Sequence, residues 1–215
     1  MRRNFWVTHR VFWCFIIVLF VGATFFLSLT NDIETMLYVG KHRTKWANLF
    51  FVNITKLGEH YLYIIFGVGL IVAKNWRLAV AIGTLGITVL ALSFVLKMGF
   101  GTPRPAATLR ALGLLDTVES IRGEPYHFGN TSFPSGHTMS AFALFGFLAL
   151  LRHKHPRQVV FLLLVALCIG LSRIYLLQHF PTDAFAGAII GVFLALTWFK
   201  THNYLQKSSF IGQHI

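Results

Sequence analysis

The sequence has 215 residues, of which 55% are hydrophobic and only 12% are charged. Charged residues make up roughly a quarter of a soluble domain, so this composition excludes an ordinary soluble globular protein and indicates a membrane protein. A formal net charge of +12 would indicate nucleic-acid binding in a soluble chain. In a membrane protein the loops account for such an excess, and we expect no nucleic-acid partner.

Two cysteines, Cys14 and Cys168, lie inside separate apolar runs. They offer neither a disulfide framework nor the spacing of a metal site, so we expect them to pack between helices. The sequence shows no internal repeat, low-complexity tract or linker-like segment. We therefore expect one domain over residues 1–215.

The first apolar run covers residues 11–29 and follows Arg2, Arg3 and Arg10. A helix needs about 20 residues to cross a bilayer, so this run predicts a transmembrane helix. The run is long for the apolar core of a signal peptide and has no convincing cleavage site, so we expect an uncleaved anchor. Residues 31–60 mix basic and apolar side chains, which favours an amphipathic helix at the membrane interface.

Five later apolar runs predict transmembrane helices at about residues 57–73, 78–96, 135–151, 159–177 and 183–199. Short basic turns join the second helix to the third and the fourth to the fifth. The longest polar connection lies between the third and fourth helices. The predicted fold class is therefore all-α: a polytopic membrane protein with six transmembrane helices and an interfacial helix between the first two.

Six crossings place both termini on one side of the membrane. Ten of the 19 lysines and arginines lie on that side: Arg2, Arg3, Arg10, Lys74, Arg77, Arg152, Lys154, Arg157, Lys200 and Lys207. All seven acidic residues lie on the opposite side, together with the remaining cations. Cations beside short loops set the orientation of a membrane protein. We therefore expect an inner (cytoplasmic) membrane protein with cytoplasmic termini and the other face toward the periplasm or exterior.

Three polar motifs gather on that outer face. They are Lys97-x6-Arg104-Pro105, Pro134-Ser135-Gly136-His137 and Ser172-Arg173-x5-His179-x3-Asp183. Ionisable groups at membrane depth are expensive, so their default interpretation is functional. A helix that begins at Ser135 and Gly136 directs unpaired N–H groups and its positive dipole end toward an anion. Together the motifs supply the cations, histidines and carboxylate that phosphoryl transfer requires.

The third motif has a spacing suited to nucleophilic catalysis. Asp183 follows His179 by four residues, so its carboxylate can accept a hydrogen bond from one ring nitrogen and leave the other for attack. Arg173 adds a permanent cation whose fork fits phosphate oxygens. The alternative for this motif alone is a helix end with a snorkelling arginine and a solvated histidine.

The chain resembles the type 2 phosphatidic acid phosphatase superfamily. Its three motifs match the three-part signature of that family without gap or substitution. The resemblance implies a phosphatase that needs no metal and no cofactor. It also implies that His179 attacks phosphorus to form a phosphohistidine, that Asp183 orients His179, and that His137 acts as general acid and then as general base. The implied phosphate-binding groups are Lys97, Arg104, Ser135, the Gly136 amide and Arg173. Ser172 either contacts the phosphate or only orients Arg173.

The implied substrate is a lipid phosphate that enters sideways from the bilayer, and no protein partner can be inferred. Undecaprenyl diphosphate is the favoured substrate, with phosphatidylglycerophosphate, phosphatidate and lipid A as alternatives. The same intermediate would also serve a lipid phosphotransferase, and vanadate in the same site would give a haloperoxidase. A different class is a non-catalytic protein that binds or transports lipid headgroups. We expect His127, in the long connection, to be a solvated loop residue.

Overall fold

The computed structural model describes residues 4–121 and 124–211. Within these ranges the regular structure is helical apart from one isolated bridge between Ile121 and Glu124, so the predicted all-α fold is confirmed. In the part of the chain that the structure describes, four helical spans are long and apolar enough to cross a membrane: Arg10–Leu29, Trp76–Ala111, Pro156–Tyr175 and Pro181–Gln206. Two further apolar helices, Tyr61–Val72 and Gly136–Leu151, are shorter.

Helix α8 (Gly136–Leu151) forms the centre of the core, and most of its residues are buried. It packs against α9 (Pro156–Tyr175) and most extensively against α10 (Pro181–Ile211). The two helices α8 and α10 approach closely because α10 presents glycines there. A Cβ added at Gly187 would lie 2.6 Å from the Ser135 carbonyl oxygen, and one at Gly191 would lie 2.6 Å from the Met139 carbonyl oxygen.

Three helices surround this core and expose apolar side chains outward: α2 (Arg10–Leu29), α5 (Tyr61–Val72) and α6 (Trp76–Phe100). On α2 the exposed side chains include Val18, Val21 and Phe25. An apolar outer surface of this extent is what a protein surrounded by lipid requires. A short helix, α1 (Phe5–Thr8), precedes α2, whereas Arg2 and Arg3 lie outside the described residues.

The segment predicted as one interfacial helix is in fact divided, so that prediction is wrong. It forms α3 (Asp32–Lys41), α4 (Lys45–Ile54) and the 3-10 helix η1 (Thr55–Gly58). The break follows from a second helix start. Asn31 accepts a hydrogen bond from the Ile33 N–H to cap α3, and Thr44 accepts one from the Ala47 N–H to cap α4.

Other helix bounds differ from the predicted ones by a few residues, with one larger exception. Helix α10 continues to Ile211, whereas the sequence predicted an end at residue 199. Apolar character ends near residue 199, but a helix needs no apolar face once it extends beyond its packing partners. The long connection contains α7 (Pro105–Ala111) and the 3-10 helix η2 (Leu115–Thr117), neither of which was predicted.

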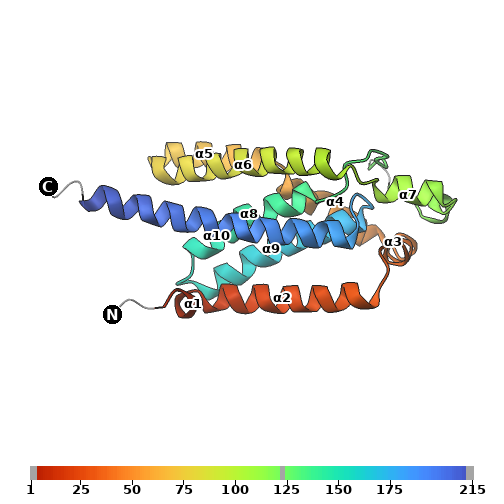
Figure 1. Ribbon diagram of the computed structural model, residues 1–215, viewed down its shortest axis with the longest axis horizontal. Helices are drawn as coiled ribbons and strands as arrows, with labels where there is room; N and C mark the ends of the chain where they lie inside the picture. The colour runs from red at the N-terminus through yellow and green to blue at the C-terminus, as the bar shows by residue number, and fades with distance from the viewer. Residues whose placement is uncertain (1–3, 122–123, 212–215) are drawn as a thin grey trace.

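The helices lie along one long axis, and the two ends of the molecule differ (Figure 1). Helix α1 and the last turns of α10 lie at one end, with the turn that joins α5 to α6 and the turn that joins α8 to α9. Helices α3, α4 and α7 lie at the other end, where α6 finishes and α8 and α10 begin. The three polar motifs therefore share one end of the molecule.

Candidate active site

Lys97 lies over the N-terminus of α8. It is on the last turns of α6, and its Nζ is 3.5 Å from the position that a Cβ at Gly136 would occupy. The hydroxyl of Ser93 lies closer still, 2.8 Å from the same position, so a side chain at residue 136 would collide. Gly136 therefore lets the lysine and the backbone at the start of α8 lie against the same small space.

Ser135 caps α8 and is fully buried. Its Oγ accepts a hydrogen bond from the Thr138 N–H at 3.4 Å and one from the Thr138 hydroxyl at 2.8 Å. Both bonds use the oxygen as acceptor, so the Ser135 hydroxyl proton can still be donated to an anion. The Ser135 N–H donates to the Asp183 carbonyl oxygen at 3.0 Å, which joins the starts of α8 and α10.

Among the described residues, the hydrogen-bond partners of the Arg104 side chain are neutral. Its Nη1 donates to the backbone oxygen and the side-chain Oε1 of Gln178, at 3.2 and 3.3 Å. Its Nε and Nη2 lie 3.4 Å from the Thr131 hydroxyl. Gln178 is buried, and its Oε1 also lies 2.6 Å from Nδ1 of His127. His127 is an exposed loop residue, as expected, and this contact joins it to the residue that holds Arg104.

Arg173 is buried at the end of α9, with 8% of its surface exposed. Its Nη1 donates to the Thr55 hydroxyl at 2.7 Å, and its buried Nε has no hydrogen-bond partner within the described ranges. Ser172 is turned the other way, since its hydroxyl donates to the Ile169 carbonyl oxygen of the same helix at 2.6 Å. The Ser172 hydroxyl is therefore used within its own helix, whereas the Arg173 guanidinium still has N–H groups that can donate to a ligand.

His179 is almost fully buried between α9 and α10. Its Nδ1 lies 3.7 Å from Oδ2 of Asp183 and makes no hydrogen bond, because that distance is too long for one. The same Oδ2 accepts instead from the Ser132 hydroxyl at 2.5 Å and from the Phe180 N–H at 2.8 Å. The carboxylate is beside His179, as the spacing predicted, but other groups hold it.

The electrostatic surroundings of His179 favour a neutral ring. Burial lowers the pKa of His179 well below its usual range, and the charges of Arg173, Arg104 and Lys97 lower the pKa further. A neutral imidazole has a lone pair on one ring nitrogen and is therefore able to act as a nucleophile. The same three cations would attract an anion to this nitrogen.

His137 lies within electrostatic range of Arg173, His179, His60 and Lys97. The wall behind it is η1, since a Cβ added at Gly58 would lie 3.2 Å from the His137 side chain. His60 follows η1, and its Nε2 is buried without a hydrogen-bond partner in the described residues. Burial lowers the pKa of His60, and the charge of Lys97 lowers it further.

The structure thus brings the predicted residues of all three motifs to one place. It also adds four residues that the sequence analysis did not identify: Thr55, His60, Ser132 and Gln178. The sequence contains little indication of them, because each interacts with a motif residue that is far from it in the chain. Only Ser132 and Gln178 could have been suspected, from their places beside motif residues.

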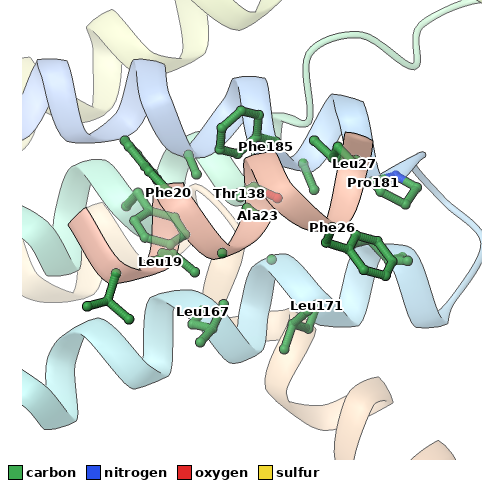
Figure 2. A pocket seen from close by; sticks show the side chains of 17 residues that line it. Leu19, Phe20, Ala23, Phe26, Leu27, Thr138, Leu167, Leu171, Pro181 and Phe185 are labelled. Carbon is green, nitrogen blue, oxygen red and sulfur yellow. The ribbon is translucent and has the colours of Figure 1, made fainter. Parts of the chain in front are cut away.

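An apolar cavity of about 420 Å³ lies behind this site, between α2 and helices α8, α9 and α10 (Figure 2). Thr138 contributes a hydroxyl group to a wall that is otherwise mainly apolar and includes Phe20, Phe26 and Leu171. The cavity is large enough for part of a hydrocarbon chain. Across residues 4–121 and 124–211, no three His, Cys, Asp or Glu side chains are grouped so that they could hold a metal ion.

Basic side chains, two histidines and a helix N-terminus lie together at one end of the apolar helix bundle of a multi-pass membrane protein, an arrangement whose chemistry suits an anion. The chain belongs to the PAP2 superfamily, which residues 75–207 match. The protein is therefore a membrane lipid phosphatase of the hydrolase class.

Three relatives support this assignment. Phosphatidylglycerophosphatase B of Bacillus subtilis (strain 168) is 30% identical over 168 residues, which are 71% of this chain and 73% of the relative. An undecaprenyl-diphosphatase of Sulfolobus acidocaldarius is 22% identical over 196 residues, 87% and 89% of the two chains. The crystal structure of a transmembrane PAP2 type phosphatidylglycerolphosphate phosphatase from Bacillus subtilis has a TM-score of 0.62 and 25% identity, covering 92% of this chain and 94% of that one.

Proposed function

We propose that this phosphatase hydrolyses a lipid-linked phosphate or diphosphate through a phosphohistidine on His179. The observation that carries the proposal is the surroundings of that residue. His179 is buried, and burial together with the charges of Arg173, Arg104 and Lys97 lowers its pKa well below the usual range. Such cations hold the non-bridging oxygens and stabilise the charge that develops on them in the transition state.

In the first step, Nε2 of His179 forms a bond to phosphorus because Nδ1 faces Asp183. The P–O bond to the lipid breaks, and the leaving oxygen takes a proton from His137. Asp183 stabilises the cationic ring that results. In the second step His137 takes a proton from water, the water oxygen attacks phosphorus, and cleavage of the P–N bond releases inorganic phosphate.

Ser135 and the N-terminus of α8 support the bound phosphate in this proposal. The Ser135 hydroxyl and the Gly136 N–H supply hydrogen bonds beside Lys97. Ser172 takes no direct part, because its hydroxyl donates to the Ile169 carbonyl oxygen. The hydrocarbon part of the substrate can extend along the apolar walls beside the site, of which the cavity lined by α2 is one.

Undecaprenyl diphosphate is the substrate that we propose first. It fits an outward-facing site, and a relative named undecaprenyl-diphosphatase matches over 87% of this chain. Phosphatidylglycerophosphate is the second candidate, because the relative named phosphatidylglycerophosphatase B is 30% identical. Lipid A, phosphatidate and transfer of the phosphoryl group to a lipid acceptor are the alternatives that the same assay separates.

The test is release of inorganic phosphate by the purified protein in detergent with EDTA, compared across these four lipids by kcat/KM. We expect undecaprenyl diphosphate to give the highest value, and His179→Ala to retain less than about a thousandth of the activity, or about 4 kcal/mol of lost transition-state stabilisation. His153→Ala, at the opposite end of the molecule, is the matched control. Activity of His179→Ala above that level would exclude the covalent role.

We further propose six membrane crossings by α2, α5, α6, α8, α9 and α10, with η1, α3 and α4 at the outer interface. The two shorter helices, α5 and α8, cross as parts of the bundle, and α8 is sheltered from lipid by its neighbours. The basic turns beside Lys74 and Lys154 favour a cytoplasmic position for the end with the termini. The site then faces the periplasm or cell exterior.

Cysteine labelling tests this orientation. In a chain with Cys14→Ser and Cys168→Ser, a cysteine at exposed Ser120 should react with a membrane-impermeant thiol reagent in intact cells. A cysteine at exposed His155 should react only after the inner membrane is opened. The reverse pattern would overturn the orientation and with it the preference for a substrate in the outer leaflet.

A further inference from the structure

One buried serine connects the three motifs without belonging to any of them. Ser132 is fully buried, two residues before Pro134. Its N–H donates to the Thr102 carbonyl oxygen at 3.0 Å, and the next N–H along the chain, that of Phe133, donates to the Thr102 hydroxyl at 2.8 Å. Its own hydroxyl donates to Oδ2 of Asp183 at 2.5 Å. Thr102 lies between Lys97 and Arg104, so this serine joins the first motif to the third.

The carboxylate of Asp183 shows why this connection matters. Lys97 and Arg104 both act electrostatically on Asp183. Even so, among the described residues neither cation lies within 4.0 Å of a carboxylate oxygen. Within the described part of the chain, His179 is the only basic residue whose nitrogen lies that close to a carboxylate, and the carboxylate is that of Asp183. Oδ2 of Asp183 instead accepts hydrogen bonds from the Ser132 hydroxyl and the Phe180 N–H. Neutral donors hold the carboxylate while the cations stay unpaired.

We propose that Ser132 is a positioning residue for the phosphoryl transfer described above, and the proposal rests on that proposed function. Its hydroxyl holds Asp183 so that Oδ2 faces Nδ1 of His179, 3.7 Å away. When Nε2 bonds to phosphorus the ring becomes cationic, and its Nδ1–H closes onto the waiting oxygen. A carboxylate that is already fixed needs no reorganisation at that moment.

The same contact keeps the cations available for substrate. Without the Ser132 hydroxyl, Oδ2 loses its shortest hydrogen bond, and a carboxylate with an unfilled acceptor turns toward the nearest cation. The charges of Lys97 and Arg104 already act on Asp183 and would attract it. Either movement would separate Asp183 from His179 and neutralise part of the charge that binds phosphate.

The test is Ser132→Ala, measured by kcat, KM and the rate of phosphohistidine formation in rapidly quenched reactions. Loss of a hydrogen bond to a charged group predicts a decrease in kcat of about ten- to a hundredfold. The rate of phosphohistidine formation should decrease by the same factor, and KM should change less than about threefold. Ser140→Ala removes an equally buried serine hydroxyl from α8 and should leave both constants unchanged.

A double-mutant cycle separates positioning from packing. If Ser132 acts through Asp183, then Ser132→Ala should add less than about twofold to the loss caused by Asp183→Ala. Additive losses, or wild-type kcat in Ser132→Ala, would overturn the proposal while leaving the phosphatase function intact. If the alanine variant does not fold, Ser132→Cys replaces it. This variant keeps a side chain of similar size, but its thiol is only a weak hydrogen-bond donor. A wild-type protein inactive on every lipid phosphate would instead refute the proposed function.

Discussion

The contact between Thr55 and Arg173 allows a test of how a distant segment supports the phosphate site. Thr55 begins η1, 118 residues away from Arg173 in the sequence, and both side chains are buried. Among the described residues, the Thr55 hydroxyl is the one hydrogen-bond acceptor that the guanidinium contacts, at 2.7 Å from Nη1. Thr55→Val keeps the shape of the side chain and removes this acceptor.

The magnitude follows from the burial of the pair. A hydrogen bond to a charged group contributes about 1.5–3 kcal/mol, and the larger values apply where water cannot replace the lost partner. Arg173 has 8% of its surface exposed and already has an unpaired Nε, so water replaces little. If the lost energy appears in transition-state binding, kcat/KM should decrease by about ten- to a hundredfold, since each 1.36 kcal/mol is tenfold.

The assay is phosphate release from a short-chain lipid phosphate, with melting temperatures in the same detergent. Thr55→Ser retains the acceptor and should remain within about threefold of wild type. Equal losses in the serine and valine variants would show that the methyl group matters and would refute the hydrogen-bond argument. So would a valine variant whose melting temperature falls while its kcat/KM is unchanged.

Three further changes test other parts of the structure. Gly187→Ala should destabilise by about 1–3 kcal/mol and lower the melting temperature by several degrees, because its Cβ would lie 2.6 Å from the Ser135 carbonyl oxygen; Gly83→Ala, with open space around it, should not. The lowered pKa of His179 means that the unfolded state binds its proton more readily, so stability is retained above about pH 6.5 and lost as pH falls below it. His179→Asn should therefore unfold at a less pH-dependent temperature between pH 7.5 and pH 5 than wild type does. His137→Ala, given a substrate with a good leaving group, should accumulate an acid-labile phosphoenzyme that a His179→Ala background abolishes.

The sequence allowed the motif residues to be predicted because each motif contains its chemistry in a short stretch. The spacing of His179 and Asp183, the cap at Ser135 and the Lys97 to Arg104 interval can all be read without tertiary information. Apolar runs then predicted which end of each helix carries a motif. The structure agrees that these residues lie at one end of the bundle.

The division of the segment between α2 and α5 could not be predicted with the same certainty, although part of the signal was present. Asn31 and Thr44 are both good N-cap residues, and a helix start after Thr44 divides the segment. The docking of η1 against the site has no local signal at all. It depends on the hydrogen bond from Arg173 to Thr55 and on the packing of Gly58 against His137. These residues come into contact only in the folded chain.

The residues that hold the two arginines of the site share one physical property, which is that they are neutral. Each guanidinium of the site is held by neutral oxygen acceptors: Arg104 by Gln178 and Thr131, and Arg173 by Thr55. A carboxylate partner would bind either arginine more strongly, but its charge would offset the positive potential that attracts phosphate. Neutral acceptors orient a cation and leave its charge unpaired. Because many neutral residue types can do this from almost any segment, the motifs identify the charged groups of such a site but not the residues that hold them.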